Sequence, residues 1–166
     1  WDGARWQPLG GGVNSTVQAL AVHQGFLIAG GSFSVAGGAS TSNVARWDGI
    51  SWAPLSSGVN NAVQAMTVYG GELVLGGNFT TAGGIPANRI ARWNGFAWDT
   101  FGTGFNGTVY AFTEYAGELI AGGGFSQAEG TTMYRLSRWD GTAWQAVGGG
   151  GSTNSTVWAL GIFDGD

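Results

Sequence analysis

The chain has 166 residues, of which 43% are hydrophobic and only 10% charged, with a net charge of −4 and no cysteine. So few charges in so hydrophobic a chain argue against a disordered tail, and the lack of cysteine excludes disulfides and thiol chemistry. All six basic residues are arginine and no apolar run could span a membrane. We therefore expect no nucleic-acid partner and no membrane insertion.

In chain order, the opening segment predicts one short strand that contains Pro8, and the next two strands form a hairpin. The stretch Val17–His23 alternates hydrophobic and polar residues, as a half-buried strand does. A tight turn at Gln24 and Gly25 joins it to a second predicted strand, Phe26–Gly31. Because the chain begins at Trp1, we expect a processed product or a piece of a longer protein.

A looser segment leads to a second predicted hairpin. Its strands are Asn43–Trp47 and Ile50–Leu55, joined at Asp48-Gly49. Asp-Gly between strands is typical of a two-residue turn, because both turn positions need positive φ. This turn predicts that Trp47 lies opposite Ile50. No helical periodicity of useful length follows anywhere in the chain.

The same four-strand pattern returns every 46 residues, as the tryptophans at 6, 52, 98 and 144 show. The repeat units are residues 1–46, 47–92, 93–138 and a truncated 139–166, within one repeat domain, 1–166. A repeat of this length with four strands is typical of a β-propeller blade. The sequence therefore predicts an all-β protein made of four-stranded blades.

The pieces of each repeat resemble the kelch motif. In one repeat they read ELVLGG (Glu72–Gly77), RIARW (Arg89–Trp93) and FAW (Phe96–Trp98). The ARWDG..W variety is similar to repeats of bacterial and fungal surface proteins with propellers of the kelch and galactose-oxidase type. The resemblance covers essentially the whole chain and implies a β-propeller in a secreted or cell-surface protein.

The strand count predicts three complete blades with one orphan strand at each end, which is an incomplete ring. Closed propellers usually have four to eight blades. Three arrangements remain open: a piece of a longer propeller whose remaining blades lie elsewhere, closure by self-association, or stacking into larger assemblies. Two copies together hold as many strands as a seven-bladed ring. We expect a homo-oligomer for this chain, because open blade faces are apolar.

Catalytic chemistry finds little support in the sequence. The copper site that the galactose-oxidase resemblance implies needs several histidine and tyrosine ligands and a cysteine, whereas His23 is the chain's one histidine. Among the acidic residues, Asp48 and Asp140 sit at the predicted hairpin turns, where Asn94 replaces them. A role that asparagine fills equally well is turn-making. We expect no catalytic residue, metal or cofactor. A carbohydrate-active enzyme is the third of the functions considered, and these residues argue against it.

The recurring tryptophans are interpreted as structural residues that pack one blade on the next. Stacked tryptophans also bind sugars, but near-identical copies inside strands favour packing. This structural set comprises Trp6, Trp47, Trp52, Trp93, Trp98, Trp139 and Trp144, together with the turn residues Asp48, Asn94 and Asp140.

The long loops are the predicted ligand face. Loops between the second and third strands, and between the fourth strand and the next repeat, must emerge on the same side, because each strand reverses direction. The candidate ligand-facing residues are Asn14, Asn60, Asn106, Thr80, Thr81, Gln127, Glu129, Thr131 and Tyr134. We expect a non-enzymatic binding or adhesive scaffold with a glycan or protein ligand. The alternative is a fragment or engineered repeat protein with a purely structural role.

Overall fold

The protein is built from β-strands, as its hydrophobic pattern predicts. The computed structural model describes residues 3–148 and 154–163, and none of these residues lies in a helix. Within that part of the chain there is accordingly no helix of the length and hydrophobicity needed to cross a membrane. The prediction of an all-β fold is confirmed.

Twelve strands form three antiparallel four-stranded sheets, one for each complete predicted repeat. In each sheet the strands are paired in the order in which they follow along the chain. The first sheet holds β1 (Thr16–His23), β2 (Phe26–Ser32), β5 (Val44–Trp47) and β6 (Trp52–Pro54). The second holds β7 (Val63–Tyr69), β8 (Glu72–Gly77), β11 (Ile90–Trp93) and β12 (Trp98–Thr100). The third holds β13 (Val109–Tyr115), β14 (Glu118–Gly123), β17 (Leu136–Trp139) and β18 (Trp144–Ala146).

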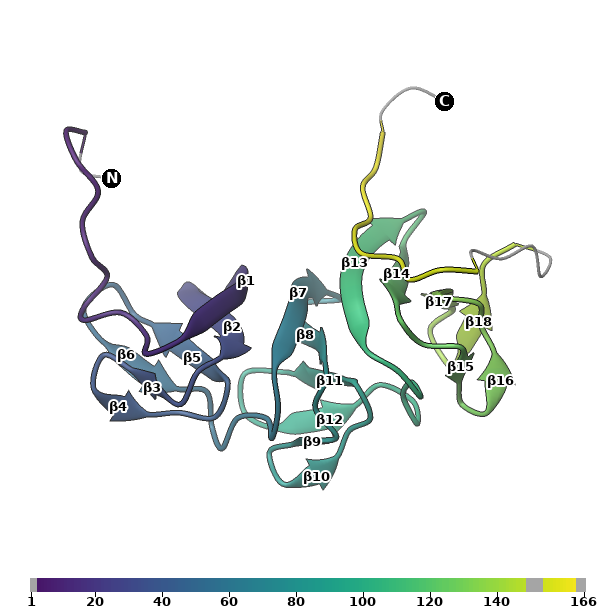
Figure 1. Ribbon diagram of the computed structural model, residues 1–166, viewed down its shortest axis with the longest axis horizontal. Helices are drawn as coiled ribbons and strands as arrows, with labels where there is room; N and C mark the ends of the chain where they lie inside the picture. Colours follow the sequence, from purple (N-terminus) through teal and green to yellow (C-terminus); the bar gives the residue numbers. More distant parts are fainter. Residues whose placement is uncertain (1–2, 149–153, 164–166) are drawn as a thin grey trace.

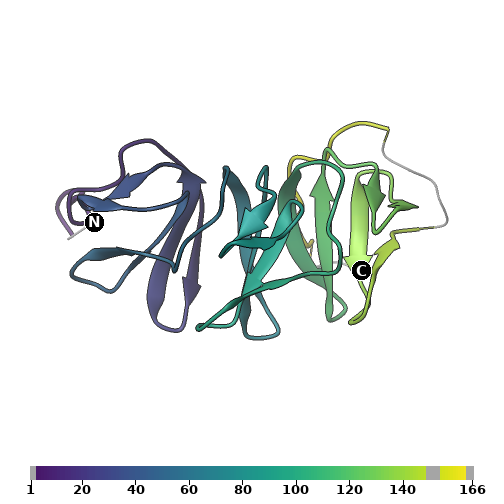
Figure 2. The ribbon, with the colours of Figure 1, turned by 90° about the horizontal axis from the view of Figure 1, so that it is seen from below.

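The three sheets stand side by side in a row (Figures 1 and 2). The first strand of the middle sheet, β7, contacts both β1 and β13, while β6, β12 and β18 lie farther apart. Across the first of these contacts, the Gln18 amide donates to Gln64 Oε1 at 3.0 Å. Within the described residues the sheets make an open row.

Glycines in the second strand of each sheet let the next sheet approach closely. A Cβ placed on Gly30 would lie 2.7 Å from Val63 Cγ1, and Met66 flanks the same spot. A Cβ placed on Gly76 would lie 2.7 Å from Val109 Cγ1. Real Cβ atoms do not come so near to other carbon atoms, so glycine is required for this spacing. The contact repeats from one sheet to the next.

The two larger hydrophobic cores lie between sheets, while a smaller cluster that includes Ala29, Phe33 and Ala45 belongs to the first sheet alone. One cluster joins residues of the first sheet to residues of the second: Ile28 and Val44 with Leu73, Leu75, Trp93 and Trp98. The next cluster joins the second sheet to the third: Val74 and Ile90 with Leu119, Ala121 and Trp144. Since hydrophobic burial is the main driving force of folding, each sheet depends on its neighbour for stability.

The turn at Asp48-Gly49 differs from the prediction. Trp47 pairs with Trp52 and Ala45 with Pro54, so the connection holds four residues instead of two. Asp48 Oδ1 accepts hydrogen bonds from the backbone N–H groups of both residues 50 and 51, at 2.8 and 2.7 Å, and this widens the turn. The predicted pairing of Trp47 with Ile50 is therefore wrong. Ile50 lies at the tip of the turn, 86% exposed.

The two predicted orphan strands are also absent from the described residues. Neither residues 6–9 nor residues 157–162 form a strand, because each lacks a neighbouring strand to complete a hydrogen-bonded ladder. Both segments nevertheless keep the places that the repeat predicts. Trp52 Nε1 donates to the Leu9 carbonyl at 2.9 Å, as Trp144 Nε1 donates to the Phe101 carbonyl at 3.1 Å. Trp1 lies outside the described residues.

Replacing Gly76 with alanine tests the contact between sheets. We expect Gly76→Ala to lower the free energy of unfolding by about 1–3 kcal/mol, because the added methyl group overlaps Val109 and Phe112. Gly161→Ala is the matched control, since a Cβ there has nothing within 4 Å and should change stability by less than about 0.5 kcal/mol. Urea unfolding measures both. Equal effects of the two substitutions would contradict close packing at Gly76.

Candidate functional site

Among the described residues, the long loops lie at one edge of the row of sheets. Each loop that leaves a second strand folds into a small hairpin: β3 (Val35–Ala36) with β4 (Ala39–Ser40), β9 (Thr81–Ala82) with β10 (Ile85–Pro86), and β15 (Gln127–Ala128) with β16 (Thr131–Thr132). Isolated bridges tie each hairpin to the loop that precedes its sheet: Val13 to Ala36, Val59 to Ala82 and Phe105 to Ala128. The loop face is thus an ordered surface.

The three recurring asparagines hold this surface together. Asn60 Oδ1 accepts hydrogen bonds from the backbone N–H groups of Thr80 and Thr81 at 2.8 and 3.0 Å, and Asn60 Nδ2 donates to Thr80 Oγ1. Asn14 and Asn106 make the same contacts with their own hairpins, again 20 and 21 residues away. Their side-chain groups are already engaged within the chain, which gives them a structural role at this face.

Two pockets open between neighbouring sheets on the loop face. The pocket between the first and second sheets has a volume of about 400 Å³, and Asn14 and Asn60 lie in its wall. The pocket between the second and third sheets has a volume of about 300 Å³, and Asn106, Gln127 and Glu129 line it. The two pockets overlap at four positions of the repeat, including Asn43 with Arg89 and Asn60 with Asn106, and extend from there over different residues. This recurrence makes them the best candidate ligand sites.

The lining of the second pocket is rich in groups that hydrogen-bond. It combines the predicted residues Asn106, Gln127 and Glu129 with Asn88, Arg89 and Thr103. Glu129 lies at the tip of β15–β16 with a φ of +52°, where the other two hairpins carry Gly37 and Gly83. A left-handed φ costs energy in residues other than glycine, so this carboxylate is a departure from the repeat.

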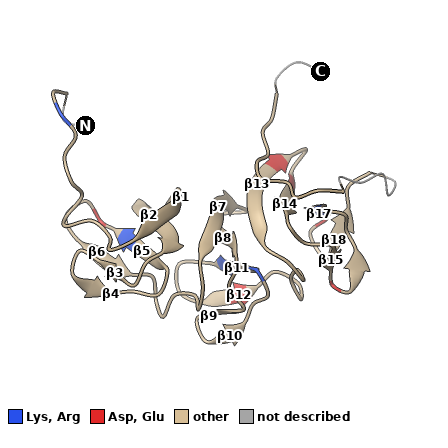
Figure 3. Ribbon diagram, viewed as in Figure 1, with Lys and Arg blue, Asp and Glu red and all other residues tan. Residues whose placement is uncertain are grey.

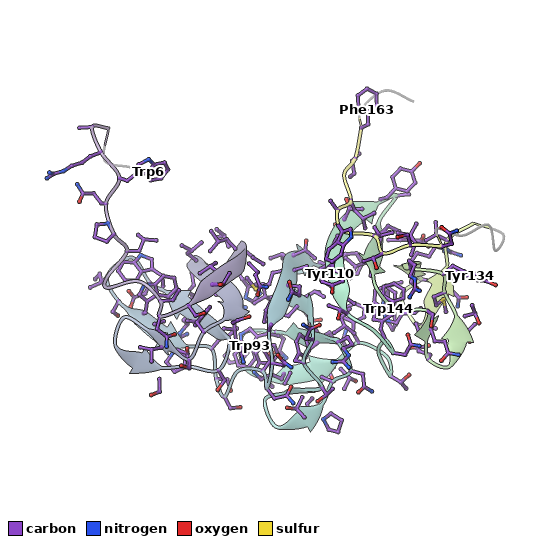
Figure 4. The ribbon with its side chains drawn as sticks, in the orientation of Figure 1. Trp6, Trp93, Tyr110, Tyr134, Trp144 and Phe163 are labelled. Carbon is purple, nitrogen blue, oxygen red and sulfur yellow. The ribbon has the colours of Figure 1, made fainter. Side chains whose placement is uncertain are left out.

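The remaining predicted residues are spread over the face. Thr80 and Thr81 belong to the Asn60 contacts, while Thr131 is exposed in β16. Tyr134 is 44% exposed and lies beyond that hairpin, away from the second pocket (Figure 4). The structure brings together only part of the predicted set.

Arg89 is a pocket residue that sequence reasoning missed. It has a φ of +67°, as the equivalent Asn43 and Arg135 have positive φ, and its Nη1 donates to the Asn78 carbonyl. Arg135 Nη1 likewise donates to the Gly124 carbonyl at 2.5 Å. The signal in the sequence is a second arginine three residues before Arg92 and Arg138, at the start of a predicted strand.

Arg92 and Arg138 are held by acidic residues of their own sheets. Arg92 pairs with Asp99 at 2.7 Å and with Glu72 at 3.3 Å, and Arg138 pairs with Glu118. The Arg92 guanidinium, through its hydrogen bond, lowers the pKa of Asp99 below its usual value. Charges are sparse along the row (Figure 3), and these pairs lie away from the loop pockets.

The tryptophans and turn residues take structural positions. Facing pairs pack with ring centroids 5.2–5.5 Å apart: Trp47 with Trp52, Trp93 with Trp98, and Trp139 with Trp144. Trp98 and Trp144 are buried, whereas Trp6, at a segment without a sheet, is 82% exposed (Figure 4). At the turns, the side-chain oxygens of Asp48, Asn94 and Asp140 each accept two backbone N–H groups.

No arrangement typical of a metal centre occurs among residues 3–148 and 154–163, which contain no group of three or more histidine, cysteine, aspartate or glutamate side chains. His23 is buried, and its Nε2 lies 3.1 Å from the Gly71 carbonyl of the next sheet. It therefore joins two sheets at the edge opposite the loop face.

Substitution of Asn106 tests the loop contacts. We expect Asn106→Ala to lower the free energy of unfolding by about 1–2 kcal/mol, because two backbone N–H groups lose their acceptor. Asn106→Asp retains an acceptor and should cost less. Hydrogen exchange at the amides of Ser126 and Gln127 reports the change directly. Unaltered exchange of both amides in Asn106→Ala would refute this role.

The turn aspartate Asp140 predicts a pH dependence. Backbone hydrogen bonds from Ala143 and Thr142 lower its pKa from 3.8 to about 2. A depressed pKa in the folded state contributes stability above pH 3.8, and that contribution is lost as the pH falls towards 2. Asp140→Asn keeps the acceptor oxygen but does not titrate, so its stability should fall less over this interval. Thermal unfolding curves that shift in parallel with pH for both proteins would disprove the prediction.

Comparison with known proteins adds information on the fold alone. No family model matches the sequence, and no curated protein matches it. Among solved structures, the chain is similar to a crystal structure of the computationally designed Ika4 protein, with a TM-score of 0.58 and 17% sequence identity. The match covers 96% of this chain and 89% of that chain. At this identity the likeness extends to the arrangement of the strands.

Proposed function

We propose that the chain is a kelch-like β-propeller module that acts as a non-enzymatic binding scaffold of a secreted or cell-surface protein. The sheets supply a rigid frame, because their two larger cores are shared between neighbours. The ligand face is the edge with the long loops. The observation that carries this proposal is the pair of pockets on that edge, which share four positions of the repeat and are otherwise lined by different residues.

The second pocket fits part of a glycan best. The amide of Gln127 and the hydroxyl of Thr103 can donate to and accept from sugar hydroxyl groups, and the side-chain oxygen of Asn88 can accept from them. The Asn106 side chain and the Asn88 Nδ2 shape the pocket instead, because they are bonded within the chain. The carboxylate of Glu129 adds a strong acceptor, and the pocket's other charged side chain is Arg89. A protein segment that inserts polar side chains is the other ligand we consider.

A purely structural or assembly role is the alternative function. The side chains of the three asparagines at the loop face make their hydrogen bonds within the chain. This supports a scaffold without a ligand. A carbohydrate-active enzyme ranks third, since Glu129 is the one carboxylate lining the second pocket and glycoside hydrolysis typically uses two.

Binding to a glycan array, followed by matched substitutions, tests the proposed function. Glu129→Gly restores the residue type that two other hairpins carry, so it removes the carboxylate without straining the turn. We expect it to weaken binding of any retained glycan by about tenfold, in line with the loss of a charge-assisted hydrogen bond. Glu114→Gln, in β13 near the opposite edge, should leave binding unchanged.

The outcomes separate the candidates. Loss of binding in Glu129→Gly but not in Glu114→Gln supports the loop-face site. Glycan binding that is unaffected by Glu129→Gly and by Gln127→Ala contradicts a site in the second pocket. An array without retained glycans favours the structural role or a protein ligand.

A further inference from the structure

The first sheet has an apolar face on the side away from the second sheet. This first-sheet face consists of Val17, Leu20, Leu27, Ala29 and Trp52, which form one wall of a hollow of about 470 Å³. Residues 8–13 of the same chain form the other wall. Val17 is 40% exposed and Leu20 is 60% exposed. Burying such a surface removes hydrophobic side chains from water and is favourable.

Equivalent residues of the other two sheets are covered. Val63 and Val109, which correspond to Val17, are fully buried. Leu73 and Leu119, which correspond to Leu27, are fully buried as well. In both cases the cover is the preceding sheet. The first-sheet face therefore resembles the surface by which the second and third sheets pack on the sheet before them. Within the described residues, no preceding sheet covers it.

The third sheet offers the matching half, and the chain's own last segment lies on it. A Cβ placed on Gly122 would lie 2.6 Å from Val157 Cγ1 and 3.3 Å from Leu160 Cδ1. These two side chains take the place over Gly122 that Val63 and Met66 take over Gly30. The segment 154–163 forms no strand, and its Val157 N–H donates to the Gly123 carbonyl at 3.2 Å.

We propose that the first-sheet face binds the third sheet of a second copy of this chain. The contact forms in exchange for that copy's segment 154–163 and for residues 6–9 of the first copy, which hold the place that residues 144–147 of the second copy then take. Val17 and Leu20 then lie over Gly122 of the second copy, as Val63 and Met66 lie over Gly30. The occupant is a second copy because this contact already recurs twice inside the chain. Segment 154–163 competes with the second copy for the third sheet, and it does so at high effective concentration because it belongs to the same chain. Association should therefore strengthen when this segment is loosened.

The edge opposite the loop face supports the same partner. His23 Nε2 contacts the Gly71 carbonyl of the next sheet, and the Tyr69 hydroxyl donates to the Gly117 carbonyl at 2.9 Å. The equivalent residue of the third sheet, Tyr115, is 65% exposed. In the proposed contact the Tyr115 hydroxyl of the second copy reaches the carbonyl of Gly25 in the first copy, which occupies the matching turn.

The exchange also gives two copies a number of sheets that fits a closed propeller. Two copies contribute three sheets each, six in all, which lies within the range of four to eight blades for propellers. The seven-bladed count relied on the two terminal strands, and the described residues do not form them. The contact joins the first sheet of one copy to the third sheet of the other. Two copies therefore close into a ring only when this contact forms at both places.

Sedimentation equilibrium of the full chain over a wide micromolar range tests the proposal. We expect reversible self-association that Leu20→Glu weakens by about tenfold or more, because it places a charge in the contact. Val22→Glu is the matched control on the same strand, since the equivalent position of the third sheet is Glu114, and it should have little effect. Leu160→Glu, which loosens segment 154–163, should strengthen association.

Three results would overturn the proposal. These are a monomer at every concentration both in the original chain and in Leu160→Glu, equal effects of Leu20→Glu and Val22→Glu, and weaker association in Leu160→Glu. Circular dichroism of each variant checks that the sheets are intact. Leu20 and Val22 are mostly exposed in the single chain, so neither substitution should unfold it.

Discussion

The contact of a second-strand glycine with the first strand of the next sheet underlies the rest of this structure. Gly30 meets Val63 and Gly76 meets Val109 at distances that leave no room for a side chain. The two larger hydrophobic cores form around these contacts, between sheets. The row of sheets is thus stable as a series of neighbour contacts, as in other repeat proteins. The terminal sheets are the places where such a contact can be left open.

Because the frame is shared between sheets, the loops at one edge are free to differ. The asparagine contacts fix the backbone of each hairpin, and the pocket linings change around them. Glu129 illustrates this separation, since it occupies a left-handed position that glycine fills in the other two hairpins. A recurring framework with variable pockets is the physical basis for the proposed binding role.

The sequence could predict the strands of the three sheets and the all-β class, because period-two alternation and the spacing of the repeat are strong signals. It could not predict the pairing of Trp47 with Trp52, since the extra width of the turn comes from two hydrogen bonds to Asp48 Oδ1. The predicted strands at the two ends are absent for a different reason. A hydrogen-bonded ladder needs a neighbouring strand, and the local sequence does not show whether one is present. Arg89 was missed since its role in the pocket depends on a positive φ.

The most direct test of the central claim, that glycine contacts join the sheets, is a nuclear Overhauser measurement in the intact chain. If Gly76 packs against Val109, cross-peaks are expected between the Hα protons of Gly76 and the methyl groups of Val109, which belong to different sheets. Cross-peaks between Val68 and Leu73, within the second sheet, provide the internal reference. Reference signals without any Gly76–Val109 cross-peak would show that the sheets do not pack in this way, and would contradict the account.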